Sequence, residues 1–280
     1  MRIRNRYGRP RELIVRYALL LVILSITVGP LLWQFSSSLK GTGEAIFGSQ
    51  ATFLPTSPTI DAYIKVFQSL PIGMYMLNSL IVCVLSITSQ VIFPTMAGYM
   101  MSRKGWHGRK FVFAILVISM MFSFESIMVS LFMMTNSFGI VDTLIGVWLP
   151  SAISAVNIFI MRAAFSAVPD EVEDAAVLDG ANEWQRFFRV YFPAGLGALL
   201  VVVINSFVSA WDDFLWPFIV LRSESNFTLT LGLSRLAESS LGFDVRIVMA
   251  GSIIAIIPVL IVFIILQRWF YKGVAQGAIK

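Results

Sequence analysis

Six long apolar segments restrict this chain to a membrane more firmly than any other feature of its sequence. They cover about Leu13–Phe35, Tyr75–Tyr99, Phe111–Met134, Thr143–Phe165, Ala194–Phe218 and Val248–Tyr271. An α-helix needs about 20 predominantly apolar residues to cross the hydrocarbon core of a bilayer. Only 13% of the residues are charged, against about 25% in soluble domains. The sequence therefore predicts an all-α integral membrane protein with six transmembrane helices.

Basic residues are concentrated on one side of this predicted bundle. Most of the 21 Lys and Arg residues lie near the two termini, between the second and third segments, and around the connection of the fourth to the fifth. The other side carries only Lys40, Lys65, Arg222, Arg235 and Arg246. Because cytoplasmic loops carry an excess of Lys and Arg, we expect both termini in the cytoplasm. Positive charge that follows topology does not indicate a nucleic-acid partner.

A single cysteine and a single histidine argue against several functional classes. Cys83 lies in an apolar segment and cannot form a disulfide within the chain. His107 alone cannot supply the several imidazoles of a zinc site or a histidine-box enzyme. The sequence also has no phosphate-binding loop of the pattern G-x-x-x-x-G-K-[ST]. We expect no metal, no cofactor and no catalytic residue in this chain.

The segment 169–193 is the longest polar interruption in the C-terminal half of the chain and is rich in acidic residues. Pro169 favours the first turn of a helix, where its missing N–H has no partner to lose. Gly180 can adopt the left-handed conformation that ends such a helix. One face of this helix would carry Val172, Ala175, Ala176 and Asp179.

A second short helix is predicted directly after this turn. Asn182 can cap it, its range is Glu183–Val190, and we expect Pro193 to end it before the fifth apolar segment. Such a helix–turn–helix element can bind in a groove of a soluble subunit and carry that subunit's movement into the membrane. The alternative interpretation is an ordinary amphipathic helix on the membrane surface.

The order of residues in this element is similar to the EAA signature of ABC importer permeases. Asp174–Ala181, followed by Phe187 and Pro193, resembles the signature in spacing and in its position before the penultimate apolar segment. Further stretches similar to sugar-importer permeases are Asn78–Leu80, Trp211–Pro217 and Gln267–Lys280. The resemblance extends from about Gly73 to the C-terminus. It is closest to the smaller permease of maltose-type carbohydrate importers.

This resemblance implies a type I ABC importer permease fold in a bacterial or archaeal cell membrane, with a carbohydrate or a related polyol as cargo. A second, different permease would complete the pathway, two cytoplasmic ATPase subunits would bind ATP and Mg²⁺, and an extracytoplasmic solute-binding protein would deliver the cargo. Residues 73–271 would form the permease domain, after residues 1–72 and before a cytoplasmic tail, 272–280. The residues expected to contact the ATPase are Asp174, Ala175, Ala176, Asp179, Gly180 and Phe187, with Gly277 and Lys280 in the tail.

Polar residues inside the apolar segments are candidates for the substrate pathway, because charged groups at the bilayer centre cost about 2.5–3.5 kcal/mol on insertion scales. These candidates are Glu125, Asn157, Asn205, Asp212 and Asp213, and Trp211 is added because its ring could stack on the face of a sugar. For any one residue the structural explanation is favoured: hydrogen bonds between helices would explain the polar residues, and a membrane-interface position would explain the tryptophan.

Two residues depart from the family pattern. Asp174 stands where the signature has glutamate. Aspartate keeps the negative charge, but its side chain is shorter and reaches less far. Asp212 stands where asparagine is usual. Two other classes of protein remain open, an ATP-independent secondary transporter or channel, and a membrane enzyme or assembly factor. The first would use membrane charges for ion coupling, and the second would need a catalytic cluster.

Overall fold

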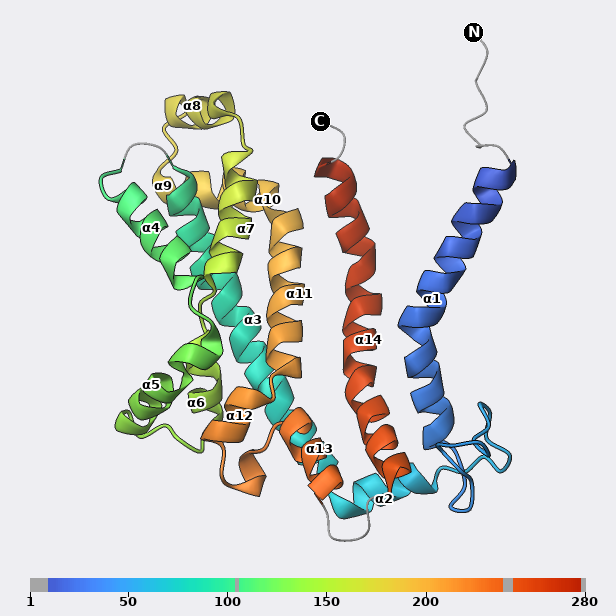
Figure 1. Ribbon diagram of the computed structural model, residues 1–280. Helices are drawn as coiled ribbons and strands as arrows, with labels where there is room; N and C mark the ends of the chain where they lie inside the picture. Colours follow the sequence, from blue (N-terminus) through green and yellow to red (C-terminus); the bar gives the residue numbers. More distant parts are fainter. Residues whose placement is uncertain (1–9, 104–105, 239–243, 278–280) are drawn as a thin grey trace. The chain divides into compact units, whose positions relative to one another are not determined.

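The structure is a computed structural model that describes residues 10–103, 106–238 and 244–277, and all regular secondary structure in them is helical (Figure 1). The chain divides into two compact units. One contains Met1–Leu70 with Arg235–Ile256, and the other contains Pro71–Ser234 with Ile257–Lys280. The second unit includes the acidic segment 169–193 and therefore positions the candidate site.

The first unit contains α1 (Pro10–Ser38), α2 (Asp61–Ser69) and the beginning of α14 (Val245–Gly277). The α1 helix exposes apolar side chains along most of its length, as expected for a helix that faces lipid or another subunit. The shorter α2 is amphipathic and buries Ala62 and Val66.

The connection between α1 and α2 is held by two charged side chains. Lys40 is only 2% exposed and donates a hydrogen bond to the carbonyl oxygen of Thr52 at 2.6 Å. The carboxylate of Glu44 accepts the backbone N–H groups of Thr56 at 2.9 Å and Ser57 at 2.8 Å. These hydrogen bonds lower the pKa of Glu44 to about 2, and the bond from Thr56 has the largest effect. The polar connection thus has a defined conformation.

The second unit is built around α3 (Ile72–Ser102), on which α7 (Ala155–Ser166) and α11 (Leu196–Asp212) pack (Figure 1). Gly98 allows α7 to approach α3 closely. A Cβ atom at this position would lie 2.7 Å from the Cβ of Met161, which is shorter than a normal contact. Small residues at helix interfaces have this role in membrane proteins, because they let two backbones pack directly.

Three helical stretches are each long and apolar enough to cross a membrane, namely Leu13–Ser38, Ile72–Ser102 and Val245–Arg268. The number rises to 6 if each of three bent helix pairs is one span. These pairs are Arg109–Ser119 with Phe124–Ser137, Leu144–Ser151 with Ala155–Ser166, and Glu183–Ala194 with Leu196–Asp212. By length and composition, the described residues therefore contain between 3 and 6 candidate spans.

The predicted third segment, Phe111–Met134, is not one straight helix. It is divided into α4 (Arg109–Ser119) and α5 (Phe124–Ser137), which meet at 101°. The backbone of Ser123 is extended, with ψ 147°, and this interrupts the helix before α5. The predicted fourth segment, Thr143–Phe165, also bends, by 47°. Hydropathy predicts the length of an apolar run but carries no information on such a change of direction.

Short helices complete the described part of the chain. Their bounds are α6 (Leu144–Trp148), η1 (Leu149–Ser151), α8 (Asp170–Leu178), α9 (Glu183–Arg186), η2 (Phe187–Tyr191), α10 (Phe192–Ala194), α12 (Leu215–Val220), η3 (Glu224–Asn226) and α13 (Leu229–Glu238). Trp216 connects α12 to α6, because its buried indole Nε1–H donates a hydrogen bond to the carbonyl oxygen of Gly146 at 3.1 Å.

Asp142 joins the connection between α5 and α6 to the segment after α12. Its carboxylate accepts the backbone N–H groups of Arg222 and Ser223, both at 2.9 Å, and the hydroxyl of Ser223 at 2.5 Å. Its own carbonyl oxygen accepts from the side-chain amide of Asn226 at 2.6 Å. The hydrogen bonds from Ser223, followed by that from Arg222, lower the pKa of Asp142 to about 2.

This lowered pKa predicts a pH dependence of stability. The ordinary pKa is 3.8, so the stabilising contribution of the Asp142 carboxylate is complete above about pH 4 and is lost as the pH falls towards 2. Asp142→Asn tolerates the positive φ of 60° at this position but carries no charge. We expect the variant to have a lower Tm in detergent than the wild type at pH 7, and the Tm difference to shrink between pH 5 and pH 2. A difference that stays constant over this range would contradict the assignment.

Candidate functional site

The α8 helix ends in a Schellman motif. Gly180 has a φ of +76°. Its N–H donates to the carbonyl oxygen of Val177 at 3.0 Å, and the N–H of Ala181 donates to that of Ala176 at 3.0 Å. These two bonds define the motif, in which glycine is the usual left-handed residue. The prediction that Gly180 ends the first helix is confirmed.

The outer surface of α8 is free of contacts that would bury it. The structure describes every residue of this helix, and none of them is buried. Leu178 is 88% exposed, and Val172 and Val177 are about half exposed. Three of the predicted contact residues, Asp174, Ala175 and Asp179, are also exposed, and Ala176 is half-buried. Exposed apolar side chains on an acidic helix are typical of an interaction site.

The second helix is capped as predicted but ends differently. Asn182 and Gln185 form a reciprocal capping box at the start of α9. The chain then continues through the π-helical η2 into α10, and Pro193 lies inside α10. The prediction that Pro193 ends the helix is therefore wrong. Proline is accepted here because it occupies the first turn of a new helical stretch, and the direction changes only after Gly195.

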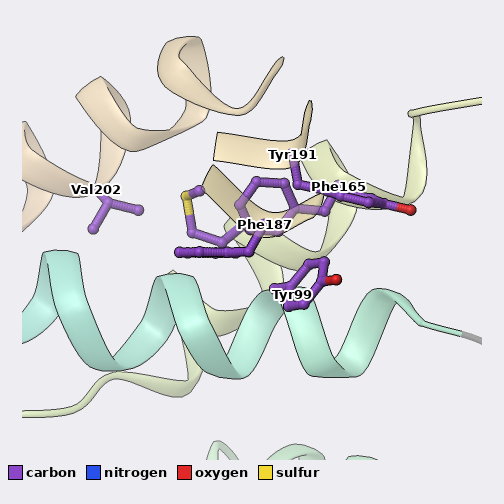
Figure 2. Close-up of a cluster of buried hydrophobic side chains, with 6 residues drawn as sticks. Tyr99, Phe165, Phe187, Tyr191 and Val202 are labelled. Carbon is purple, nitrogen blue, oxygen red and sulfur yellow. The ribbon is translucent and has the colours of Figure 1, made fainter. Parts of the chain in front are cut away.

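An aromatic cluster lies between this element and the long helices. Figure 2 shows Phe165, Phe187 and Tyr191 gathered beside Tyr99 of α3. The ring centroids of Tyr99 and Tyr191 are 4.9 Å apart, and those of Tyr99 and Phe187 are 5.1 Å apart. Phe187 was expected at the ATPase contact, but it is only 6% exposed. The structure thus places its ring in the buried aromatic cluster, where it connects η2 to α3 and α7.

Glu173 connects α8 to the same region through charged groups. Its carboxylate forms ion pairs with Arg103, directly after α3, and with Arg186 of α9 at 3.3 Å. The hydroxyl of Tyr191 donates to Glu173 and accepts a hydrogen bond from Arg103 at 3.0 Å. The three charged side chains are 14–21% exposed, so water screens their interactions only in part. A displacement of α8 would therefore act directly on the end of α3.

Glu183 of α9 forms a second polar connection to α3, in addition to that of Glu173. The hydroxyl of Tyr99 donates to the Glu183 carboxylate at 2.8 Å, and Glu183 also pairs with Arg186. The sequence analysis did not identify Glu173, Arg103 or Tyr191 as functional residues. The sequence places these oppositely charged residues on the same predicted side of the membrane. It does not indicate which of them form ion pairs.

A polar network lies farther along the bundle, between α3, α7 and α11. Asn157 is 1% exposed, and its side-chain amide donates to Gln90 at 3.0 Å and to the hydroxyl of Ser206 at 3.3 Å. The Asn205 side-chain amide donates to the Asn157 oxygen at 3.1 Å. Two of the predicted pathway residues, Asn157 and Asn205, are therefore in direct contact.

This network forms one wall of a cavity of about 440 Å³. The polar residues that line it are Ser86, Gln90, Ser151, Ser154, Asn157, Asn205, Ser206, Ser209 and Asp213. Asp213 also accepts the backbone N–H of Trp216 at 3.3 Å, at the start of α12. The cavity offers hydrogen-bond donors and acceptors in an otherwise apolar bundle, which suits a ligand with many hydroxyl groups.

The remaining predicted residues lie elsewhere. Glu125 is exposed in the first turn of α5, and Asp212 is exposed at the end of α11. Trp211 is only 2% exposed, and its indole stacks on Phe207 with ring centroids 5.7 Å apart. None of the three lines the cavity of about 440 Å³. In the predicted tail, Gly277 is the last residue of α14, and Lys280 lies outside the described residues.

Comparison with known proteins identifies the family. Residues 90–276 match the family model of the binding-protein-dependent transport system inner membrane component. The arabinooligosaccharides transport system permease protein AraQ of Halalkalibacterium halodurans is 32% identical over 262 residues, which are 92% of this chain and 93% of the relative. The lactose transport system permease protein LacG of Rhizobium radiobacter is 31% identical over 267 residues, 95% of this chain and 96% of the relative.

A solved structure agrees with these matches. A chain in the crystal structure of a bacterial ABC transporter involved in the import of the acidic polysaccharide alginate superimposes with a TM-score of 0.83 at 25% identity. The match covers 94% of this chain and 99% of that chain. The resemblance inferred from Asp174–Ala181 is thereby confirmed. This chain belongs to the family of binding-protein-dependent transport system inner membrane components and is a permease of the carbohydrate ABC importer class.

Proposed function

We propose that this chain forms one half of the pathway of an ATP-driven carbohydrate importer and couples that pathway to a cytoplasmic ATPase through α8. The observation that carries the proposal is the combination of an exposed outer face on α8 with the ion pairs of Glu173 on its inner side. The first provides a docking surface, and the second provides a rigid connection to α3.

In this proposal α8 binds in a groove of one ATPase subunit, and a second permease presents its own helix to the other subunit. Asp174, Ala175, Ala176, Asp179 and Leu178 form the contact. Each ATPase binds ATP and Mg²⁺, and this chain contributes no catalytic residue. Closure of the ATPase pair moves α8, and the Glu173–Arg103 ion pair passes that movement to α3. A packed, hydrogen-bonded connection of this kind can switch between two arrangements.

The proposed topology has six spans, with each bent helix pair counted as one span, and both termini in the cytoplasm. The excess of Lys and Arg in the loops on that side supports this orientation. The permease domain would be residues 73–271, and the tail that contains Gly277 and Lys280 would reach the ATPase interface.

The cargo in this proposal is an oligosaccharide or a related polyol, which an extracytoplasmic solute-binding protein delivers. Relatives named for arabinooligosaccharides and for lactose support this class of cargo. The polar cavity beside Asn157 supports it as well, because Asn205 and Asp213 can exchange hydrogen bonds with sugar hydroxyl groups.

The test is to purify the tagged chain in mild detergent with whatever remains bound and to reconstitute it in liposomes. We expect an ATPase and a second permease to remain bound, and ATP hydrolysis to rise when the solute-binding protein and its sugar are added. Sugar uptake should require ATP on the side of the vesicle membrane where the ATPase subunits lie. A chain that purifies alone and transports without ATP would instead be a secondary transporter or channel.

A further inference from the structure

A second cavity, of about 740 Å³, is lined by residues at the start of α4 and by Arg162 of α7. Three basic side chains line it, Arg109, Lys110 and Arg162. The rest of its wall is formed by Gly108 and by three aromatic side chains, Trp106, Phe111 and Phe113. We call it the basic cavity. It is separate from the coupling contacts of Glu173 and from the polar cavity beside Asn157.

The charge of the basic cavity is not balanced within the described part of the chain. Its lining includes no acidic residue. Within the described residues, Arg109, Lys110 and Arg162 form no ion pair. Arg162 is instead held by its guanidinium group, which lies 4.8 Å from the ring centroid of Phe113, and by a hydrogen bond from its Nε to the carbonyl oxygen of Met101 at 3.4 Å. These contacts fix the position of the cation and leave its charge uncompensated.

The surface next to the basic cavity is apolar. From its first turn onward α4 exposes large apolar side chains, with Phe111 70%, Ile115 48% and Ile118 52% exposed. The cations therefore lie at the point where an apolar, exposed helix surface begins, near the end of the long apolar helix α3. Tryptophan at such a boundary is typical of the membrane–water interface, and Trp106 occupies that position.

We propose that the basic cavity binds the headgroup of an anionic phospholipid, whose acyl chains lie along the exposed face of α4. Basic pockets between transmembrane helices on the cytoplasmic side recognise such headgroups. Arg109 and Arg162 present guanidinium groups, which match phosphate geometry and can donate two hydrogen bonds to it. The uncapped first turn of α4 adds backbone N–H groups of the same polarity. The apolar wall distinguishes a lipid from a soluble phosphate, because a free ion would gain nothing from it.

The test uses the full chain, purified in detergent and immobilised by a tag, with phosphatidylglycerol as the probe. Its dissociation constant is compared with that of phosphatidylcholine with the same acyl chains. We expect phosphatidylglycerol to bind at least tenfold more tightly. The double variant Arg109→Gln with Lys110→Gln should weaken its binding roughly 25-fold, about fivefold for each basic side chain near an anionic headgroup.

A matched control removes the same charge elsewhere. Arg16 and Arg189 are exposed and do not line the basic cavity. Their replacement by glutamine should change the affinity less than threefold. If the double variant at 109 and 110 does not fold, Lys110→Gln alone is used, because this side chain is exposed and its loss should weaken binding about fivefold.

Three results would overturn the proposal. In the first, the control variant weakens binding as much as the cavity variant, so that the effect is general electrostatics. In the second, phosphatidylcholine binds as tightly as phosphatidylglycerol. In the third, millimolar inorganic phosphate displaces the lipid, so that the cavity takes a soluble anion. None of these results bears on coupling through α8.

Discussion

Replacement of Gly180 by valine is expected to abolish ATP-driven uptake while the chain still inserts into the membrane. Gly180 has a φ of +76°, and a β-branched residue is strongly disfavoured in this region. A strained left-handed residue costs about 1–3 kcal/mol, so the Schellman motif would open and α8 would lose its orientation relative to α9. We expect uptake by reconstituted vesicles to fall more than tenfold, and the ATPase to be lost during purification.

Asparagine at the same position provides the matched control. It accepts the left-handed conformation far better than valine, and a Cβ atom on residue 180 would meet nothing within 4 Å. Gly180→Asn should therefore keep most of the uptake. Equal activity of the valine variant and the wild type would show that α8 does not need this turn, and the coupling assignment would be lost.

The variant Glu173→Gln is expected to separate docking from coupling. It removes the charge that pairs with Arg103 and Arg186 but leaves the outer face of α8 unchanged. Loss of hydrogen bonds to a charged, largely buried group costs roughly 2 kcal/mol. We expect the ATPase to remain bound, while stimulation of ATP hydrolysis by the loaded binding protein and sugar uptake both fall at least tenfold.

Two comparison variants make this result specific. Glu171→Gln makes the same chemical change at an exposed position of the same helix, and it should leave uptake close to that of the wild type. Tyr191→Phe keeps the ring in the aromatic cluster but removes the hydroxyl that bonds to Glu173, so it should share part of the defect. Normal uptake by Glu173→Gln, or loss of the ATPase from it, would contradict the proposed connection.

Local features of the acidic segment 169–193 could be predicted from the sequence. Gly180 and Asn182 have the conformation and the capping role expected of them, because a helix end depends on residues only a few positions apart. Pro193 shows the limit of the same argument. Proline ends a helix in many contexts, yet here the wide turn of η2 precedes it, and the helical path continues to Gly195.

Of the predicted pathway residues, some line the polar cavity and others do not. Asn157 and Asn205 were selected as polar residues in apolar segments, and they meet in one network. Trp211 was selected because its ring could stack on a sugar, but it is buried against Phe207 and does not line the polar cavity. The polarity of a side chain indicates that it avoids lipid. It does not indicate whether that side chain packs against a neighbouring helix or lines a cavity.

The sequence by itself determined the membrane class, the family and the position of the acidic helix–turn–helix element, because these follow from apolar length and a short ordered motif. The tertiary structure alone decided that Glu173 rather than Asp174 anchors α8, that Phe187 is buried against Tyr99, and that α4 and α5 meet at 101°. The physical reason is distance along the chain. Arg103 and Glu173 become neighbours only when α3 and α7 pack together, and no local pattern of residues encodes that contact.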